Sequence, residues 1–163
     1  SANRILDSSA RILKLDETSI YLFVGPKVPL LPMIGSIKLF ELKQNAGDKL
    51  AQIIMVSSVS NDYTHVSVRG SGDRVHSGKF CGELQNSMQK RYADYKDKIS
   101  GGGHPKAAEC TFKTDKVTFC DVLTRVTEVL SEMQLHDRLA AAGKLDDAQK
   151  ARADKLGLEY LKK

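Results

Sequence analysis

A run of three glycines, Gly101 to Gly103, constrains this chain more than any other local feature. Glycine is unfavourable inside helices and strands, but it lets the backbone adopt positive φ and approach other groups closely. A long amphipathic segment precedes the run, and the residues from Ala107 to Phe112 have the composition of a short strand. The run therefore predicts a turn between a helix and a strand, an alternation that is typical of α/β folds.

The elements around this turn follow from hydrophobic periodicity and turn chemistry. Strand patterns cover Ile20–Val24, Ala51–Val59 and Thr64–Arg69, and the turn residues 60–62 predict that the last two form a β-hairpin. Helical spacing covers 79–99 and 116–134, the second helix starting at a Thr114–Asp115 cap, with a weaker pattern over 33–42. We expect an α/β fold in which helices pack on a mixed β-sheet.

The organisation along the chain suggests one domain with two appendages. Amphipathic spacing near the N-terminus predicts a connector helix over residues 1–18, and the domain itself is expected to span 19–134. Residues 135–163 are predicted to form a peripheral helical tail, since large apolar residues are few there, with Gly143 and Gly157 as helix C-caps. The chain begins without methionine, so we expect a piece of a longer protein.

Composition indicates a cytoplasmic protein without a membrane partner. No run approaches the roughly 20 apolar residues of a membrane span, and no signal-peptide pattern opens the chain. Cys81, Cys110 and Cys120 lack metal-ligand spacing, and all three fall in predicted helices or strands. We expect buried, reduced thiols and no zinc site.

The net charge of +5 is modest, but positive charge gathers before the glycine run. Between positions 79 and 106 six basic residues (Lys79, Lys90, Arg91, Lys96, Lys98, Lys106) face three acidic ones (Glu83, Asp94, Asp97). This distribution favours an anionic partner, nucleic acid above all. The alternative is a helix with an ordinary solvated face of mixed charge.

Two places could supply donors for an anion. His104 and Lys106 follow the glycines, and successive backbone N–H groups of such a turn can cradle a phosphate. Arg69 ends a predicted strand just before Gly70, where a guanidinium suits bidentate phosphate recognition. The alternatives are a loose glycine turn with a solvated histidine, an imidazole that only stiffens the loop, and a surface arginine.

The order of these motifs resembles that of a known family. Val-Ser-Val-Arg-Gly at 66–70, an amphipathic helix, and Ser-Gly-Gly-Gly-His-Pro-Lys-Ala-Ala at 100–108 are similar to the DHHA1 domain of DHH phosphoesterases. The resemblance covers about residues 20–132 and is greatest to archaeal RecJ-like exonucleases, which are related to a replication factor. It implies a DHHA1-like mixed sheet that grips substrate across a cleft from a separate catalytic DHH domain.

The resemblance also implies roles for individual residues. Arg69 and His104 would contact phosphate, and Lys106 would lie where a further contact is made. The glycines Gly101, Gly102 and Gly103 would let the substrate approach the backbone. The chain departs from the family at Glu109, where glycine is usual, and an acid there weakens anion binding unless it points away.

The catalytic residues of the family are missing from this chain. The family's DHH domain holds two manganese ions with a D-H-H triplet, which the sequence lacks. Asp146 and Asp147 lie in the tail and suit a helix N-cap, and the four histidines are scattered. We therefore expect no enzyme activity and no cofactor in this chain, with Mn²⁺ only in a DHH domain of its parent.

Three functional hypotheses follow. The first is a module that binds single-stranded nucleic acid or a short oligonucleotide. The second is a protein-interaction scaffold of the replication machinery, which the resemblance would associate with GINS and the replicative helicase. The third is a phosphodiesterase with an unrecognised metal site. Tyr92 and Tyr95 could stack on bases, although their position on the apolar stripe of the predicted helix favours core packing.

Overall fold

The computed structural model describes residues 11–15, 18–26, 50–59, 63–70, 72–92, 103–113, 115 and 117–162. Its strands are β1 (Arg11–Leu15), β2 (Thr18–Pro26), β3 (Leu50–Val59), β4 (Tyr63–Gly70) and β5 (Ala107–Lys113). Its helices are α3 (Ser77–Arg91), α4 (Phe119–Ala141), α5 (Asp147–Leu156) and the short 3₁₀ helix η2 (Glu159–Lys162). The expected helix over 33–42 lies outside the described residues.

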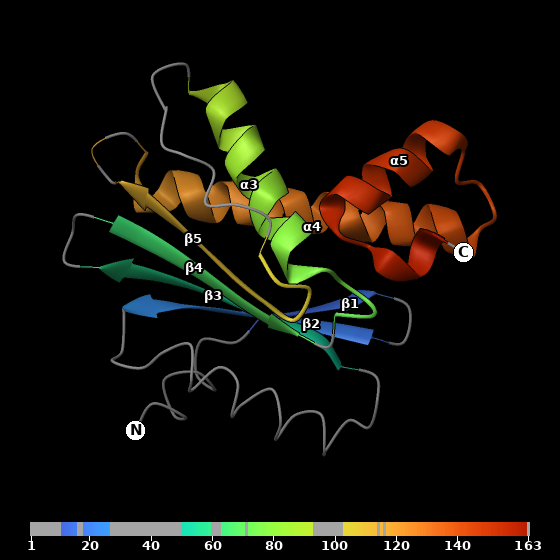
Figure 1. Cartoon of the computed structure of the whole chain (residues 1–163), viewed down its shortest axis with the longest axis horizontal. Coiled ribbons are helices and arrows are strands. Elements are labelled where there is room, and N and C mark those ends of the chain that lie inside the picture. Colours follow the sequence, from blue (N-terminus) through green and yellow to red (C-terminus); the bar gives the residue numbers. More distant parts are fainter. Residues whose placement is uncertain are drawn as a thin grey trace.

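The described strands form one mixed sheet of five strands in the order β1-β2-β3-β4-β5. The β2–β3 pair is parallel, and the other neighbouring pairs are antiparallel. The predicted hairpin is confirmed, because β3 and β4 pair antiparallel from Val59 opposite Tyr63 to Gln52 opposite Gly70. Helices α3 and α4 lie on the same side of this sheet (Figure 1), so the expected α/β fold class is confirmed.

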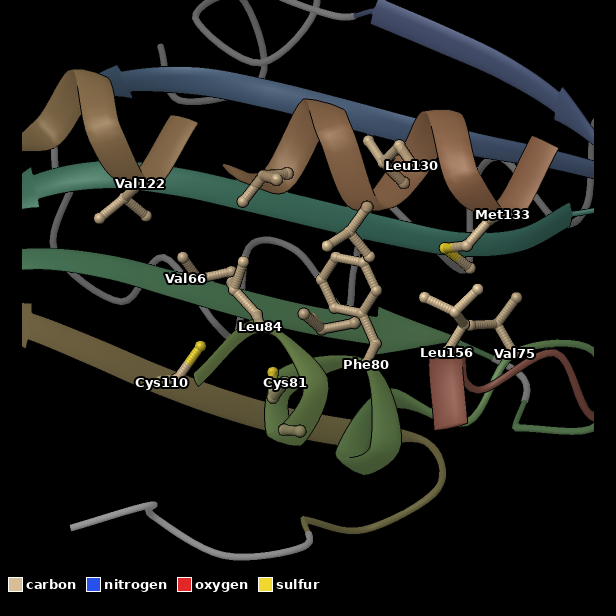
Figure 2. Packing of buried hydrophobic residues seen from close by; sticks show 14 of the residues in the cluster. Val66, Val75, Phe80, Cys81, Leu84, Cys110, Val122, Leu130, Met133 and Leu156 are labelled. Carbon is tan, nitrogen blue, oxygen red and sulfur yellow. The ribbon is translucent and has the colours of Figure 1, made fainter. Parts of the chain in front are cut away.

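The core lies between the sheet and the helices. Burial alternates along β5, where Cys110 and Phe112 are buried and Glu109 is exposed. In β4, Val66 and Val68 are buried, and so is Ser67 between them. Figure 2 shows side chains of β4, β5, α3 and α4 gathered in one cluster. Its largest fully buried members are Phe80, Phe112, Ile20, Leu84, Met88, Met133, Leu156 and Leu158. Packing of this kind supplies most of the stability of a domain of this size.

The prediction of a connector helix over residues 1–18 is wrong for the part of this segment that the structure describes. Arg11–Leu15 is a strand that pairs antiparallel with β2, from Arg11 opposite Leu22 to Leu15 opposite Thr18. A helix this short is marginal by itself, whereas pairing with β2 satisfies backbone groups of both strands and covers an open edge. The segment therefore belongs to the sheet of the domain. Residues 1–10 lie outside the described residues.

Helix α3 is shorter at its C-terminal end than the predicted 79–99. It starts at Ser77, with His76 as N-cap, and ends at Arg91. Tyr92 is extended, with φ −119° and ψ 100°, and its N–H donates to Met88 O. Lys90 and Arg91 occupy the last turn, where positive charge is favourable to the helix dipole.

Helix α4 is longer than the predicted 116–134, and it begins at a different cap. Thr118 and Asp121 form a reciprocal capping box at its start, rather than the expected Thr114–Asp115 pair. It runs to Ala141, followed by Gly143 at φ +68°. The expected boundary at residue 134 therefore falls inside a continuous helix.

The C-terminal tail is not peripheral, because its last turn enters the core. Leu156 and Leu158 are 0% exposed. Gly157 ends α5 in the left-handed conformation, as its predicted C-cap role requires, and its carbonyl accepts the N–H of His76 at 2.7 Å. Asp146 caps the start of α5, as expected. A few well-placed apolar residues thus suffice to dock the tail.

The three cysteines differ in exposure. Cys81 and Cys110 are buried as expected, whereas Cys120, on the first turn of α4, is exposed. A side-chain hydrogen bond with Cys81, together with burial, raises the pKa of Cys110. All three thiols are free. Within the described ranges, no helix is both long and apolar enough to cross a membrane.

The docking of the tail predicts the effect of a core substitution. Leu156→Ala is expected to lower the free energy of unfolding by about 2–5 kcal/mol, because it leaves a cavity between the tail and α3. Leu135→Ala, the same change at a side chain that is 54% exposed, should alter it by less than about 0.5 kcal/mol. Urea denaturation measures both. Equally small effects would contradict a tail that is part of the core.

Candidate functional site

The glycine turn, residues 103–106, is held between the end of β4 and the start of α3. The N–H of Ser77 donates to Pro105 O at 2.9 Å, and the N–H of Gly70 donates to Lys106 O at 3.0 Å. Since β5 begins directly after the turn, three elements fix its backbone. The turn is therefore anchored rather than loose.

Close packing explains why glycine stands in and opposite this turn. A Cβ on Gly78, in the first turn of α3, would lie only 2.0 Å from the carbonyl oxygen of Gly103. A Cβ on Gly103 would lie 2.6 Å from the Cβ of Ala108. The expected close backbone approach is thus real at Gly103, but the approaching group is the protein's own helix. Gly101 and Gly102 lie outside the described residues.

The ring of His104 stiffens the turn. Its Nδ1 accepts the N–H of Lys106 at 3.1 Å, and the backbone carbonyl of His104 accepts the N–H of Ala107 at 3.2 Å. Because Nδ1 is an acceptor, the neutral ring carries its proton on Nε2. The side chains of His104 and Lys106 are exposed. Two backbone N–H groups that a phosphate nest would need are therefore used inside the turn, while two side-chain donors face solvent.

Arg69 is engaged by the protein itself. Its Nη1 donates to the carbonyls of Val68 at 2.9 Å and Ala108 at 3.3 Å, and its Nη2 pairs with Glu109 Oε1 at 3.0 Å. The Arg69 side chain is 16% exposed and that of Glu109 is 42% exposed. Glu109 therefore lies on the Arg69 side of the sheet and occupies the guanidinium that the family resemblance assigns to phosphate.

A second basic side chain faces the same carboxylate. The Nε2 of His65 lies 3.7 Å from Glu109 Oε2, and its Nδ1 lies 3.1 Å from Thr111 Oγ1. Glu109 sits opposite Ser67, so it is diagonal to both His65 and Arg69 on β4. Sequence reasoning missed this grouping, because the register between β4 and β5 decides it.

Charged residues also meet where α3, α4 and α5 converge. Arg152 of α5 pairs with Glu83 of α3 at 2.6 Å and with both oxygens of Glu132 of α4, at 2.5 and 2.9 Å. The hydrogen bond with Arg152 lowers the pKa of Glu132. The hydrogen bonds of Arg152 with Glu132 and with Glu83 raise the pKa of Arg152. One guanidinium thus joins three helices and positions α5 beside α3.

Tyr92 packs against the hydrophobic core and is partly buried. Burial, followed by a hydrogen bond with Asp121, raises its pKa. These contacts favour core packing over base stacking for this side chain. Tyr95 lies outside the described residues.

The part of the chain that the structure describes has no group of three or more His, Cys, Asp or Glu side chains placed to hold a metal ion. The family resemblance would place its manganese ions in a separate domain, so no residue here is assigned to them. No protein-family model and no curated protein sequence matches this chain.

The contact between Gly78 and Gly103 makes a paired prediction about helix α3. Gly78→Ala should destabilise the protein by about 1–3 kcal/mol, because the added methyl group collides with the turn. Gly82→Ala, one turn later and with nothing within 4 Å of its Cβ, should stabilise by up to about 1 kcal/mol. Thermal unfolding of both variants tests this. Stabilisation by both would mean that the turn does not press on the helix.

Proposed function

We propose that this chain is a nucleic-acid-gripping module of the DHHA1 type, in which an exposed turn contacts a phosphate of single-stranded nucleic acid. The observation that carries the proposal is the exposure of His104 and Lys106 on a turn whose backbone is anchored to β4, α3 and β5. Anchoring lowers the conformational entropy lost on binding, so two side-chain donors can hold an anion there. Nε2–H of the imidazole and the ammonium group of the lysine are the contacting donors.

Arg69 has a conditional role in this proposal. Its guanidinium already has a carboxylate partner in Glu109, so a phosphate must displace that carboxylate before it can contact the arginine. The family usually has glycine at the position of Glu109, which would leave the arginine open. Glu109 therefore lowers the affinity of this site for anions.

The proposal assigns binding and no cleavage to this chain. Its support is the absence of the D-H-H triplet from the sequence, since the resemblance places the metal chemistry in the domain that carries that triplet. A full-length parent with such a domain would perform the hydrolysis, and this module would hold the substrate.

A protein-interaction scaffold is the second candidate. The ion pair between Arg69 and Glu109 favours it, because the pair takes a guanidinium away from anionic ligands. Binding of a replication protein that survives His104→Ala would support this role. Loss of oligonucleotide binding in the same variant would support the first.

Lys106→Gln tests the turn without removing the His104 ring that stiffens it. Fluorescence anisotropy with a labelled single-stranded oligonucleotide should show about fivefold to tenfold weaker binding, equivalent to about 1–1.4 kcal/mol. His104→Ala should weaken binding about tenfold. Lys113→Gln, an equal charge change at an exposed position at the far end of β5, is the matched control. Equal effects of the two lysine variants would show that only overall charge matters.

Glu109→Gln should strengthen oligonucleotide binding about threefold to tenfold, because it removes a negative charge and releases Arg69. The gain should disappear in the Arg69→Ala background, and a double-mutant cycle measured by anisotropy gives this coupling. A gain of equal size in both backgrounds would mean that Glu109 acts only through long-range repulsion, and Arg69 would then have no part in the site.

A further inference from the structure

A cleft of about 850 Å³ lies along α3 and reaches the glycine turn. Gly78 and Gly103 line it at the start of α3, and Lys90 lines it near the end of that helix. Residues of α5, including Lys155, form part of the lining. Position 90 lies twelve residues after position 78, so the cleft follows about 18 Å of helix.

A second cavity of about 390 Å³ continues the first. The two share Glu83, Lys90 and Arg152, and the second adds Arg91 and Arg125. We call the two together the helix groove. It extends from the glycine turn, along α3, to the side of α4.

Basic residues outnumber acidic ones among the described residues that line the helix groove. Its lining includes the cations Lys79, Lys90, Arg91, Arg125, Arg152 and Lys155 and the acids Glu83 and Asp154. Four of these cations are paired: Lys79 with Asp154 and Glu159, Arg152 with Glu83 and Glu132, and Arg91 and Arg125 with Glu128. The positive potential of this concave surface therefore comes mainly from Lys90 and Lys155. Such a surface attracts an extended polyanion.

The ion pairs of the groove indicate which cations a ligand can engage. Lys90 on α3 and Lys155 on α5 are exposed, and neither pairs with another described residue. Exposed cations therefore stand on two helices that line the groove. Among the ion pairs of the described residues, Arg91 and Arg125 share the carboxylate of Glu128.

We propose that the helix groove binds the backbone of a single-stranded oligonucleotide that starts at the glycine turn, with Lys90 and Lys155 each contacting a phosphate. This inference rests on the proposed function and adds the path and length of the ligand. At the roughly 3.4 Å rise of a stacked strand, 18 Å of helix accommodates about five nucleotides. The two proposed contacts are made to phosphates, which carry no sequence information, so the contribution of these lysines is independent of base sequence.

Ligand length provides the test. Anisotropy of labelled oligothymidylates from two to eight nucleotides, with the wild-type chain, should show affinity rising up to about five nucleotides and then levelling. In the double variant Lys90→Gln/Lys155→Gln the affinity for the longer ligands should fall at least about tenfold. The affinity for the dinucleotide should fall less, because a dinucleotide at the turn does not reach Lys90 near the other end of α3.

The matched control is Lys113→Gln/Lys144→Gln, which removes two positive charges at exposed positions outside the groove. It should leave the length dependence intact. The groove variant should also flatten the slope of log affinity against log salt by about 1.4, or about 0.7 for each lost phosphate contact. Circular dichroism and thermal unfolding confirm that both variants are folded.

Several outcomes would overturn the inference, and they separate it from the proposed function. Two outcomes would contradict binding in the groove while binding at the turn still stands. One is an equal loss of affinity in the groove and control variants. The other is an affinity that does not depend on ligand length, although His104→Ala still weakens binding. If His104→Ala does not change the affinity while the groove variant still binds more weakly, binding at the turn is contradicted instead. Displacement of the oligonucleotide by oligoglutamate at equal charge concentration would assign the groove to an acidic protein.

Discussion

The contact between Gly78 and Gly103 is the constraint on which the candidate site depends. Helix α3 can start where it does only because Gly78 has no side chain between the helix and the backbone of Gly103. The N–H of Ser77, the first residue of α3, then donates a hydrogen bond to the turn. The turn also accepts a hydrogen bond from the end of β4. The same contact exposes His104 and Lys106 at a fixed place and sets the start of the helix groove. A glycine-rich motif that suggests ligand approach is here used first to pack the protein against itself.

The fold follows from the sequence wherever the signal is local. Alternation in β4 and β5, the turn residues between β3 and β4, and the apolar stripes of α3 and α4 were sufficient to predict those elements. Strand β1 was not predicted, because it forms a strand only through its pairing with β2. The end of α3 and the start of α4 were predicted wrongly because caps at Tyr92 and Thr118 override the apolar periodicity.

The candidate site was predicted in part. Sequence motifs indicated Arg69, Gly103, His104 and Lys106, and hydrogen bonds do bring the turn beside the end of β4. The partner of Arg69 could not be predicted, since the register of β5 decides that Glu109 lies diagonal to it. The helix groove could not be predicted from the sequence either. Arg152 places α5 beside α3 through contacts with Glu132 and Glu83, which lie 20 and 69 positions away along the chain. Charge counts along a single segment do not contain such information.

The proposed path of a single strand runs from the glycine turn along the helix groove. The most direct measurement is a titration of the ¹⁵N-labelled chain with an unlabelled oligothymidylate of six nucleotides, followed by amide chemical shifts. The account predicts saturable shifts at Lys106 and Ala107 and along the groove faces of α3 and α5, with the amides around exposed Leu135 unchanged. Saturable shifts that leave both the turn and the groove unchanged would contradict it.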